Sequence, residues 1–306
     1  MSLQNILTNW SAYRKGREEG GFHTYEHMWS MVVDLNKCIG CNACSVACYA
    51  ENNLAVVGKE RFAKGQQMHW MRIERYWDEP DLKADASMEF SEMGASFLPM
   101  MCQQCNSATC EPVCPVAATY HTPDGLNAQV YNRCIGSRYC SNNCPYRLRY
   151  FNFYSHYETS WPEPMNLQLN PDLAVRDKGV MEKCTFCVQR IRSSKDDARR
   201  ENRKVRDGEV KPACVQGCPT SALVFGDLAE HESAVSKLWQ QHHPKAYNNI
   251  YYPMIKCKTD PSDPHCQTEG HKEHGHEAKE SARGYRIFEA LNTDPKVLYL
   301  ERVREV

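Results

Sequence analysis

Fifteen of the seventeen cysteines lie in four short blocks. The first block, Cys38, Cys41, Cys44 and Cys48, has the spacing C-x2-C-x2-C-x3-C, with which bacterial ferredoxins hold iron-sulfur clusters. The other blocks consist of Cys102, Cys105, Cys110 and Cys114; Cys134, Cys140 and Cys144; and Cys184, Cys187, Cys214 and Cys218. These spacings predict iron-sulfur chemistry in all four blocks.

The third block lacks one thiol. Ser137 stands where a second cysteine is expected, whereas the closing Cys-x-x-x-Cys-Pro is kept. A serine hydroxyl is far less acidic than a thiol, so it is a poorer ligand for iron.

Ligation geometry makes the blocks work in pairs, because the last cysteine of one block reaches the other cluster of a pair. The second and third blocks are neighbours, which leaves the first and fourth to close around them. We therefore expect an α+β fold with two nested bacterial-ferredoxin-like modules. The expected divisions are an N-terminal arm (1–30), a first module (31–53 and 180–228), an insertion (54–99), a second module (100–155), a linker (156–179) and a C-terminal extension (229–306).

Two other uses of clustered cysteines fit less well. Structural zinc sites usually take two separated pairs of ligands, rather than three or four cysteines in a short run closed by proline. Disulfide frameworks belong to short secreted domains, whereas this chain has 306 residues.

The composition is that of an ordinary globular protein. Hydrophobic residues make up 42%, charged residues 25%, and the formal net charge is -1, so nothing favours nucleic acid. The mean hydropathy is -0.66, and no stretch approaches the roughly eighteen apolar residues of a membrane helix. The first residues lack the apolar core of a secretory signal, so we expect any export to depend on a partner.

Periodicity and turn residues place the blocks on secondary structure. We expect a strand at 31–35 and a helix at 45–51 around the first block, and a hairpin of 119–121 with 128–131 across a Pro-Asp-Gly turn. Further expected strands cover 68–76, 219–226 and 297–303. Further expected helices cover 228–241 and 283–291, the basic segment 188–211 is expected to form a helix and a loop, and the charged segment 78–95 is expected to be a surface loop.

Several features allow two interpretations. The basic segment 188–211 could dock an acidic partner, but its interspersed Asp and Glu favour a solvated face. Cys257 and Cys266 could form a disulfide or remain free thiols. The histidines near 265–276 favour a solvated loop over a metal site, and Trp70, Trp77 and Trp161 favour packing over electron transfer.

Several motifs together carry a family resemblance. They read VDLNKCIGCNACSVACYAENN, CQQCNSATCEPVCPVAAT, YNRCIGSRYCSNNCPYRLRYFNF, GVMEKCTFCVQRI, ACVQGCPTSALVFGDL and GYRIFEALNTDPKVLYL. The chain resembles the four-cluster iron-sulfur subunit of the complex iron-sulfur molybdoenzyme family. It is most similar to the iron-sulfur portion of alternative complex III and the related menaquinone reductase complexes.

The resemblance implies four ligand sets. They are Cys38, Cys41, Cys44 and Cys218; Cys184, Cys187, Cys214 and Cys48; Cys102, Cys105, Cys110 and Cys144; and Cys134, Cys140 and Cys114, with Ser137 at the vacant position. An iron without its thiolate is easily lost, so we expect three 4Fe-4S clusters and one 3Fe-4S cluster, in preference to an oxygen-ligated fourth cube.

The resemblance also implies the function: an electron-transfer subunit of a membrane-bound respiratory quinone oxidoreductase. The 3Fe-4S end would face a polytopic quinone-binding membrane subunit, with Arg138, Tyr139 and 147–153 near the contact. The second redox subunit would be a multihaem cytochrome c, or alternatively a molybdopterin protein of polysulfide, tetrathionate or dimethyl sulfoxide reductase type. We expect a peripheral membrane protein, on the periplasmic face, that performs no bond chemistry itself.

A self-contained iron-sulfur enzyme with substrate at the open position near Ser137 is a different class of function. No constellation of acid, base and nucleophile accompanies that position in the sequence, which disfavours an enzyme.

Overall fold

The computed structural model describes residues 27–77, 94–156, 161–243 and 282–303. Its largest sheet has the strand order β8-β1-β10-β9. Strand β1 (Trp29–Asp34) lies inside it, antiparallel to β8 (Leu223–Asp227) and parallel to β10 (Val297–Leu300). The short strand β9 (Gly284–Tyr285) pairs with β10 at the edge. Three distant parts of the sequence thus form one sheet.

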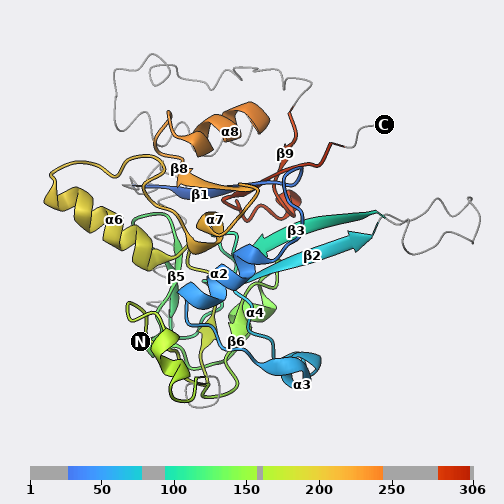
Figure 1. Cartoon of the computed structure of the whole chain (residues 1–306), viewed down its shortest axis with the longest axis vertical. Coiled ribbons are helices and arrows are strands. Elements are labelled where there is room, and N and C mark those ends of the chain that lie inside the picture. Colours follow the sequence, from blue (N-terminus) through green and yellow to red (C-terminus); the bar gives the residue numbers. More distant parts are fainter. Residues whose placement is uncertain (1–26, 78–93, 157–160, 244–281, 304–306) are drawn as a thin grey trace, which may run out of the picture.

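Strand β1 is buried on both faces because each face packs on a different layer. Met31 and Val33 join the large core that contains many of the block cysteines. Val32 points to the opposite face and packs with Trp239 of α8 (Ala234–His242). Figure 1 shows α8 on one side of the sheet and the cysteine-bearing helices α2 and α7 on the other.

Three two-stranded sheets lie outside this sheet. They are β2 (Met71–Trp77) with β3 (Ala95–Met101), β4 (Thr119–His121) with β5 (Asn127–Gln129), and β6 (Tyr150–Phe151) with β7 (Met181–Glu182). The β2-β3 pair extends away from the body of the molecule (Figure 1).

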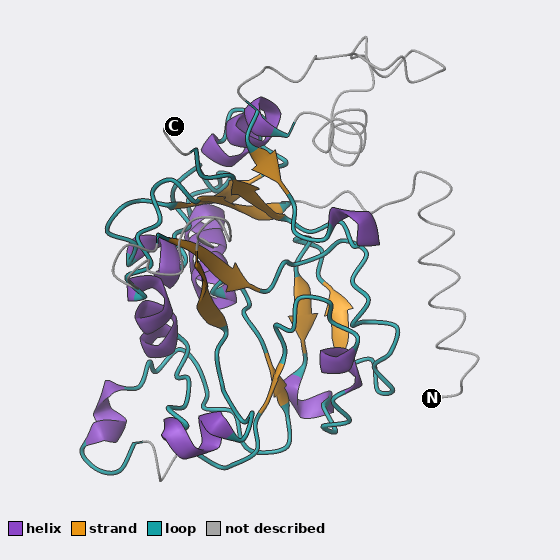
Figure 2. Cartoon of the chain, turned by 90° about the vertical axis from the view of Figure 1, so that its right-hand side faces the viewer, coloured by secondary structure: helices purple, strands orange, loops and turns teal. Residues whose placement is uncertain are grey.

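The remaining helices are short, apart from α6, and loops connect most elements (Figure 2). The α-helices are α2 (Ala43–Glu51), α3 (Gly58–Ala63), α4 (Tyr139–Asn142), α6 (Val188–Arg200) and α7 (Ala213–Gln216). The 3-10 helices are η2 (Tyr131–Arg133), η3 (Met165–Gln168) and η6 (Glu289–Leu291). Helices α2, α4, α6 and α7 carry or adjoin block cysteines.

Most expected elements are confirmed: the strands at β1, β2, β8 and β10, the β4-β5 hairpin, and the helices α2, α6 and α8. The helix expected over 283–291 is wrong. Tyr285 pairs instead with Tyr299 in the sheet, and Phe288 has a left-handed backbone with φ 53°, so only a 3-10 turn forms. Sequence patterns did not predict α3, β3 or the β6-β7 pair.

Several expectations concern segments outside the described residues. These are most of the N-terminal arm, most of the 78–95 loop, Cys257, Cys266 and the histidines at 265–276.

Candidate iron-sulfur sites

The fifteen block cysteines converge in three groups of four thiols and one group of three. Burial and the neighbouring thiols of the same group raise the pKa of Cys44, Cys48, Cys105 and Cys140. The first group is Cys38, Cys41, Cys44 and Cys218; the second is Cys48, Cys184, Cys187 and Cys214; the third is Cys102, Cys105, Cys110 and Cys144; the fourth is Cys114, Cys134 and Cys140. Each group has the membership of one ligand set named above, while bound iron stays a prediction.

The groups adjoin one another in numerical order. Besides burial, Cys44 of the first group helps to raise the pKa of Cys214 in the second, and Cys102 of the third acts in the same way on Cys184. Arg149 lies between the third and fourth groups. Burial lowers its pKa, but Cys110 of the third group and Cys140 of the fourth help to raise it above its usual value. The arrangement is a row with the first and fourth groups at its ends.

One loop shape presents the thiols at both ends of the row. In the first block Gly40 (φ 68°) and Asn42 (φ 61°) are left-handed, and Asn42 precedes α2. In the third block Gly136 (φ 73°) and Arg138 (φ 61°) repeat this conformation before α4. Such residues turn the backbone sharply, so consecutive cysteines face one centre.

The same backbone hydrogen bond to sulfur is found after two of the Cys-Pro pairs. The backbone N–H of Ala118 donates to Cys114 Sγ at 3.2 Å, and that of Ala222 donates to Cys218 Sγ at 3.3 Å. Burial raises the pKa of Cys218, but hydrogen bonds from Thr220 and nearby N–H groups outweigh burial, so the pKa is lowered. N–H groups directed at sulfur stabilise thiolate, the form that binds iron.

The second group is the most deeply buried. Burial first, and then the other three thiols, raise the pKa of Cys48 well above its usual value. The Asn52 side-chain amide faces both Cys48 Sγ at 3.5 Å and Cys187 Sγ at 3.9 Å. The Ala213 N–H also donates to Cys187 Sγ at 3.4 Å. These donors provide the hydrogen bonds that buried thiolates need.

The third group is surrounded by buried cations. Lys183 Nζ donates to Cys102 Sγ at 3.5 Å and to the Cys184 carbonyl at 2.9 Å. Lys296 is also fully buried, and burial lowers its pKa to about 7 although the Cys105 and Cys102 thiols oppose this.

The fourth group borders on solvent. The Met181 N–H donates to Cys134 Sγ at 3.3 Å, and burial raises the pKa of Cys140 against the effect of the Arg149 guanidinium. Ser137 is exposed beside it. Ile135 is 67% exposed and Tyr139 is 58% exposed, so an apolar and aromatic surface surrounds this end of the row.

These donor sets suit iron-sulfur clusters chemically. Every group offers sulfur ligands alone, they are largely withdrawn from water, and backbone N–H groups point at several of the sulfurs. Among the described residues, no three His, Cys, Asp or Glu side chains are placed to share one metal ion. A cluster of several irons separates its thiolates more widely than a single ion, so these groups remain compatible with it.

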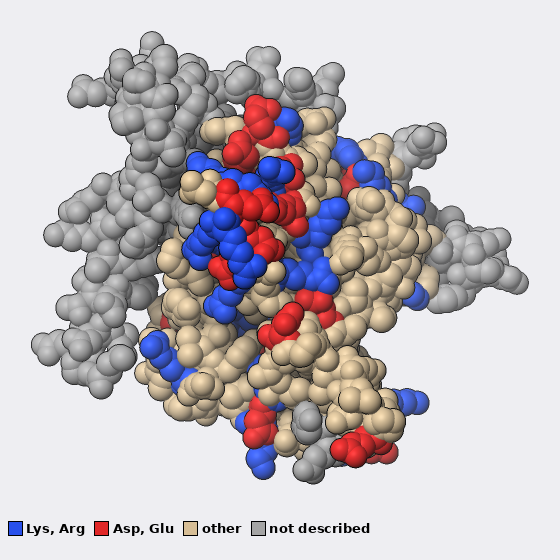
Figure 3. Space-filling view, turned by 60° about the vertical axis from the view of Figure 1, so that its left-hand side comes forward, with Lys and Arg blue, Asp and Glu red and all other residues tan. Residues whose placement is uncertain are grey.

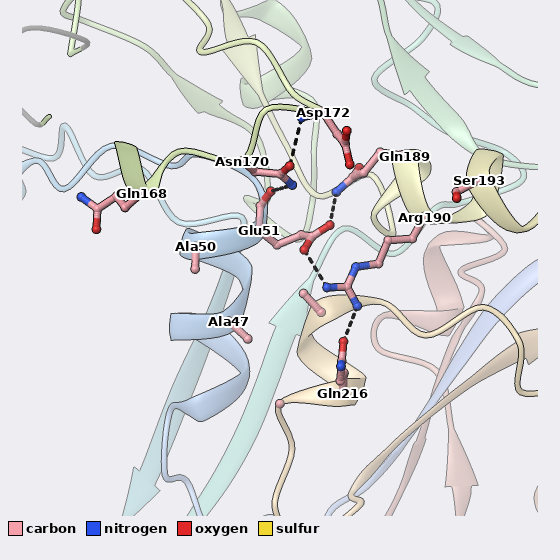
Figure 4. A pocket seen from close by; sticks show the side chains of 12 residues that line it. Ala47, Ala50, Glu51, Gln168, Asn170, Asp172, Gln189, Arg190, Ser193 and Gln216 are labelled. Atoms are coloured by element: carbon pink, nitrogen blue, oxygen red, sulfur yellow. Dashed lines mark hydrogen bonds and ion pairs between the residues drawn. The ribbon is translucent and has the colours of Figure 1, made fainter. Parts of the chain in front are cut away.

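A polar hollow of about 590 Å³ adjoins the second group, between α2, α6, α7 and the chain after η3 (Figure 4). Glu51 on α2 accepts from Arg190 at 2.6 Å and from Gln189 at 2.9 Å, both on α6. Burial raises the pKa of Glu51, but these hydrogen bonds outweigh burial, so the pKa is lowered. Because Cys48 lies on α2 and Cys187 caps α6, this ion pair helps to hold two thiols of the group in place.

The basic segment 188–211 carries both signs of charge on its surface (Figure 3). Arg199 pairs with Asp196 at 3.2 Å, and Arg200 pairs with Asp197 at 3.1 Å. Such exposed pairs contribute little to stability, but they neutralise the segment locally. The pairing agrees with a solvated face.

Asn52 and Lys183 were missed as functional candidates in the sequence, and Arg149 was expected only within the 147–153 segment near the membrane contact. Lys183 precedes a block cysteine directly and Asn52 lies four residues after another, so proximity was a usable signal. Arg149 lacked even that signal, because its position between two groups depends on the chain path after Cys144. The three tryptophans considered in the sequence differ in burial: Trp70 and Trp161 are buried, whereas Trp77 is exposed.

Comparisons with known proteins agree with the geometry. A 4Fe-4S dicluster domain family matches residues 37–118. The iron-sulfur cluster-binding subunit of menaquinone reductase from Nitratidesulfovibrio vulgaris is 36% identical over 92% of this chain and 91% of its own length. An Hdr-like menaquinol oxidoreductase iron-sulfur subunit from Archaeoglobus fulgidus is 34% identical over 70% of this chain and 76% of its own. The thiosulfate reductase electron transfer subunit of Salmonella typhi is 31% identical over 67% of this chain and 79% of its own.

The part of the chain that the structure describes contains no helix with the length and apolar character needed to traverse a membrane.

Proposed function

The chain belongs to the family of electron-transfer iron-sulfur subunits of quinone oxidoreductases and complex iron-sulfur molybdoenzymes, and from this premise we propose that it carries electrons through three 4Fe-4S clusters and one 3Fe-4S cluster. The first, second and third groups would each hold a 4Fe-4S cluster, and the fourth would hold the 3Fe-4S cluster. These clusters supply one-electron transfer. The chain's own residues bind them, shield them from water and set their potentials.

One observation carries this proposal: three groups have four thiols, the fourth has three, and an exposed serine occupies the corresponding loop position. The local conformation around Ser137 repeats that around Cys41. The absent thiol is therefore a difference in ligand and not in backbone, and it favours loss of one iron from the fourth group.

The nested-module fold supports the same assignment. Strand β1 leads into the first block and pairs with β8, which follows the fourth block, while the β4-β5 hairpin separates the second and third blocks. In this proposal residues 31–53 with 180–228 form one ferredoxin-like module, and residues 100–155 form the other. The arm, insertion, linker and C-terminal extension keep the boundaries expected from the sequence.

The ends of the row suggest where the partners bind. We assign the fourth group to a polytopic quinone-binding membrane subunit, because an apolar and aromatic surface of Ile135 and Tyr139 adjoins it and Arg138 is exposed there. The first group would face a second redox subunit, a multihaem cytochrome c. The menaquinone reductase and menaquinol oxidoreductase names of two relatives support a quinone-linked complex, and a molybdopterin protein is the alternative second partner. We place the subunit on the periplasmic face, exported with a partner.

Iron analysis combined with electron paramagnetic resonance tests the cluster assignment. The oxidised wild-type chain should contain about 15 iron atoms and show the signal of one three-iron cluster. Ser137→Cys should add about one iron and remove that signal, while Ser141→Cys, a matched change on α4, should leave both unchanged. About 16 irons in the wild type without a three-iron signal would refute the assignment.

A further inference from the structure

The buried cations of the described residues fall into two sets. Six Lys and Arg residues are buried: Arg149, Arg176, Lys183, Lys195, Arg286 and Lys296. Three of them pair with carboxylates: Arg176 with Glu182, Lys195 with Asp124, and Arg286 with Glu289. The other three, Arg149, Lys183 and Lys296, have no carboxylate ion pair among the described residues, and all three adjoin cysteines of the third group.

Lys183 is the most direct of these contacts. Its side chain is fully buried between the second and third groups, and its Nζ reaches the sulfur of Cys102 and the carbonyl of Cys184. The carboxylate next to it in sequence, Glu182, is occupied by Arg176, Trp70 and Asn152. The negative charge that balances the Lys183 ammonium must therefore come from the thiolates and whatever they bind.

Lys296 approaches the same group from a distant part of the chain. It precedes β10, is fully buried, and its Nζ has no hydrogen-bond partner among the described residues. The Cys105 and Cys102 thiols and Glu111 attract it, whereas Lys183 repels it. Burial alone disfavours the Lys296 ammonium, so its charge depends on a strongly negative centre nearby, such as the thiolates of the third group and the cluster they would hold.

The first group has no such surroundings. Burial and the neighbouring thiols raise the pKa of Cys38 and Cys44, and only backbone N–H groups oppose this rise. Lys37, which precedes Cys38 as Lys183 precedes Cys184, is exposed and pairs weakly with Asp34 at 3.8 Å. Lys183 also adjoins Cys184 of the second group, whereas the thiols that attract Lys296 belong to the third group, so the two lysines act together at the third group.

We propose that Lys183 and Lys296 raise the reduction potential of the cluster held by the third group above those of the first and second groups. This inference rests on the proposed cluster assignment. Reduction adds one negative charge to a buried cluster, and a nearby buried cation stabilises that added charge. The third group is then the first of the three four-thiol sites to accept an electron and holds it next to the fourth group.

Two substitutions remove the charge with little change of shape. Lys183→Gln keeps an N–H donor for Cys102 Sγ, and Lys296→Met removes an ammonium that donates no hydrogen bond to the described residues. Lys183→Arg keeps the charge. Lys195→Met is the control for loss of a buried lysine, because Lys195 pairs with the carboxylate of Asp124.

The experiment is a redox titration of the full, cluster-loaded chain, followed by electron paramagnetic resonance, with Cys110→Ala identifying the third-group signal by its loss. Lys183→Gln and Lys296→Met should each shift that signal to lower potential, with iron content unchanged. Lys183→Arg and Lys195→Met should leave it at the wild-type value. A third-group potential that does not move in either charge-removing variant, at full iron content, would overturn the inference.

The same samples separate this inference from the cluster assignment. If the wild type contains too little iron, or if Cys110→Ala removes no signal, the assignment itself fails. If the iron content and signals are as expected and only the potentials do not respond, the assignment stands and the role of the lysines fails.

Discussion

The first and third cysteine blocks have nearly the same local structure and differ in one ligand. Both begin Cys-Ile-Gly, both turn through a left-handed glycine and a left-handed residue two positions later, and both then enter a helix with a buried cysteine. Cys41 and Ser137 occupy the same exposed position of this loop. The comparison shows that glycine and helix start determine the loop, so a ligand can be exchanged without refolding it.

The two blocks also share an exposed isoleucine, with Ile39 60% and Ile135 67% exposed. They differ after it, because Asn42 and Ala43 of the first block correspond to Arg138 and Tyr139 of the third. The third block therefore adds a cation and an aromatic ring to the same surface. This difference gives the largest effect that we predict.

Arg138→Glu combined with Tyr139→Ser should release the subunit from membranes of cells that contain the whole complex. The aromatic contact is lost and the charge is reversed at the proposed interface, so the membrane-bound fraction should fall roughly tenfold or more. Fractionation followed by immunodetection measures it. The equivalent double change in the first block, Asn42→Glu with Ala43→Ser, should leave the subunit membrane-bound; release by both variants or by neither would contradict the assignment of ends.

Cys41→Ser makes the first block resemble the third. The loop should persist, but the first group should lose about one iron, and a second three-iron signal should appear in the oxidised protein. Iron analysis and electron paramagnetic resonance measure both changes. Retention of all four irons by the serine variant would show that a hydroxyl at this loop position is a competent ligand, and would weaken the argument from Ser137.

Gly136→Ala should destabilise the protein more than Gly40→Ala. A methyl group at Gly136 meets the backbone carbonyl of Gly179, which has little freedom to move, whereas at Gly40 it meets the ring of Phe97. Left-handed strain and the clash together should cost about 1–3 kcal/mol at Gly136. The urea concentration at which cluster absorbance is lost gives the ranking.

Gly58→Ala is the control for backbone strain alone, because Gly58 is also left-handed but has open space around its Cα. It should be the mildest of the three. Equal midpoints for Gly58→Ala and Gly136→Ala would mean that the contact with Gly179 does not matter.

Much of this comparison was predictable from the sequence, because cysteine spacing and glycine position are local properties. The loop of the first block, α2, and the serine in the third block could all be identified there. The cations around the third group could not, since Lys296 is brought to Cys105 by the pairing of β10 with β1 and by its backbone hydrogen bond to Gln103. The partner of β2 was missed for a local reason, because Pro99 interrupts the sequence of β3 and weakens its strand pattern.

The smallest predicted effect concerns the cysteines that close the two blocks. Cys48 leaves the first block to join the second group, and Cys144 leaves the third block to join the third group. Backbone N–H groups of Tyr146 and Leu148 donate hydrogen bonds to Cys144. Cys48 Sγ instead accepts a hydrogen bond from the side-chain amide of Asn52. Only the donor to Cys48 can be removed by a side-chain substitution.

Asn52→Leu should therefore lower the potential of the second-group cluster slightly, because a hydrogen bond to a cluster sulfur stabilises the reduced state. The third-group potential should not change, since the sulfurs that Asn52 contacts, those of Cys48 and Cys187, both belong to the second group. Gln189→Leu removes a neighbouring amide that touches Asn52 and Glu51 and tests general disturbance of the helices. An equal shift in both variants would mean that helix position, and not the amide-sulfur contact, sets the potential of the second group.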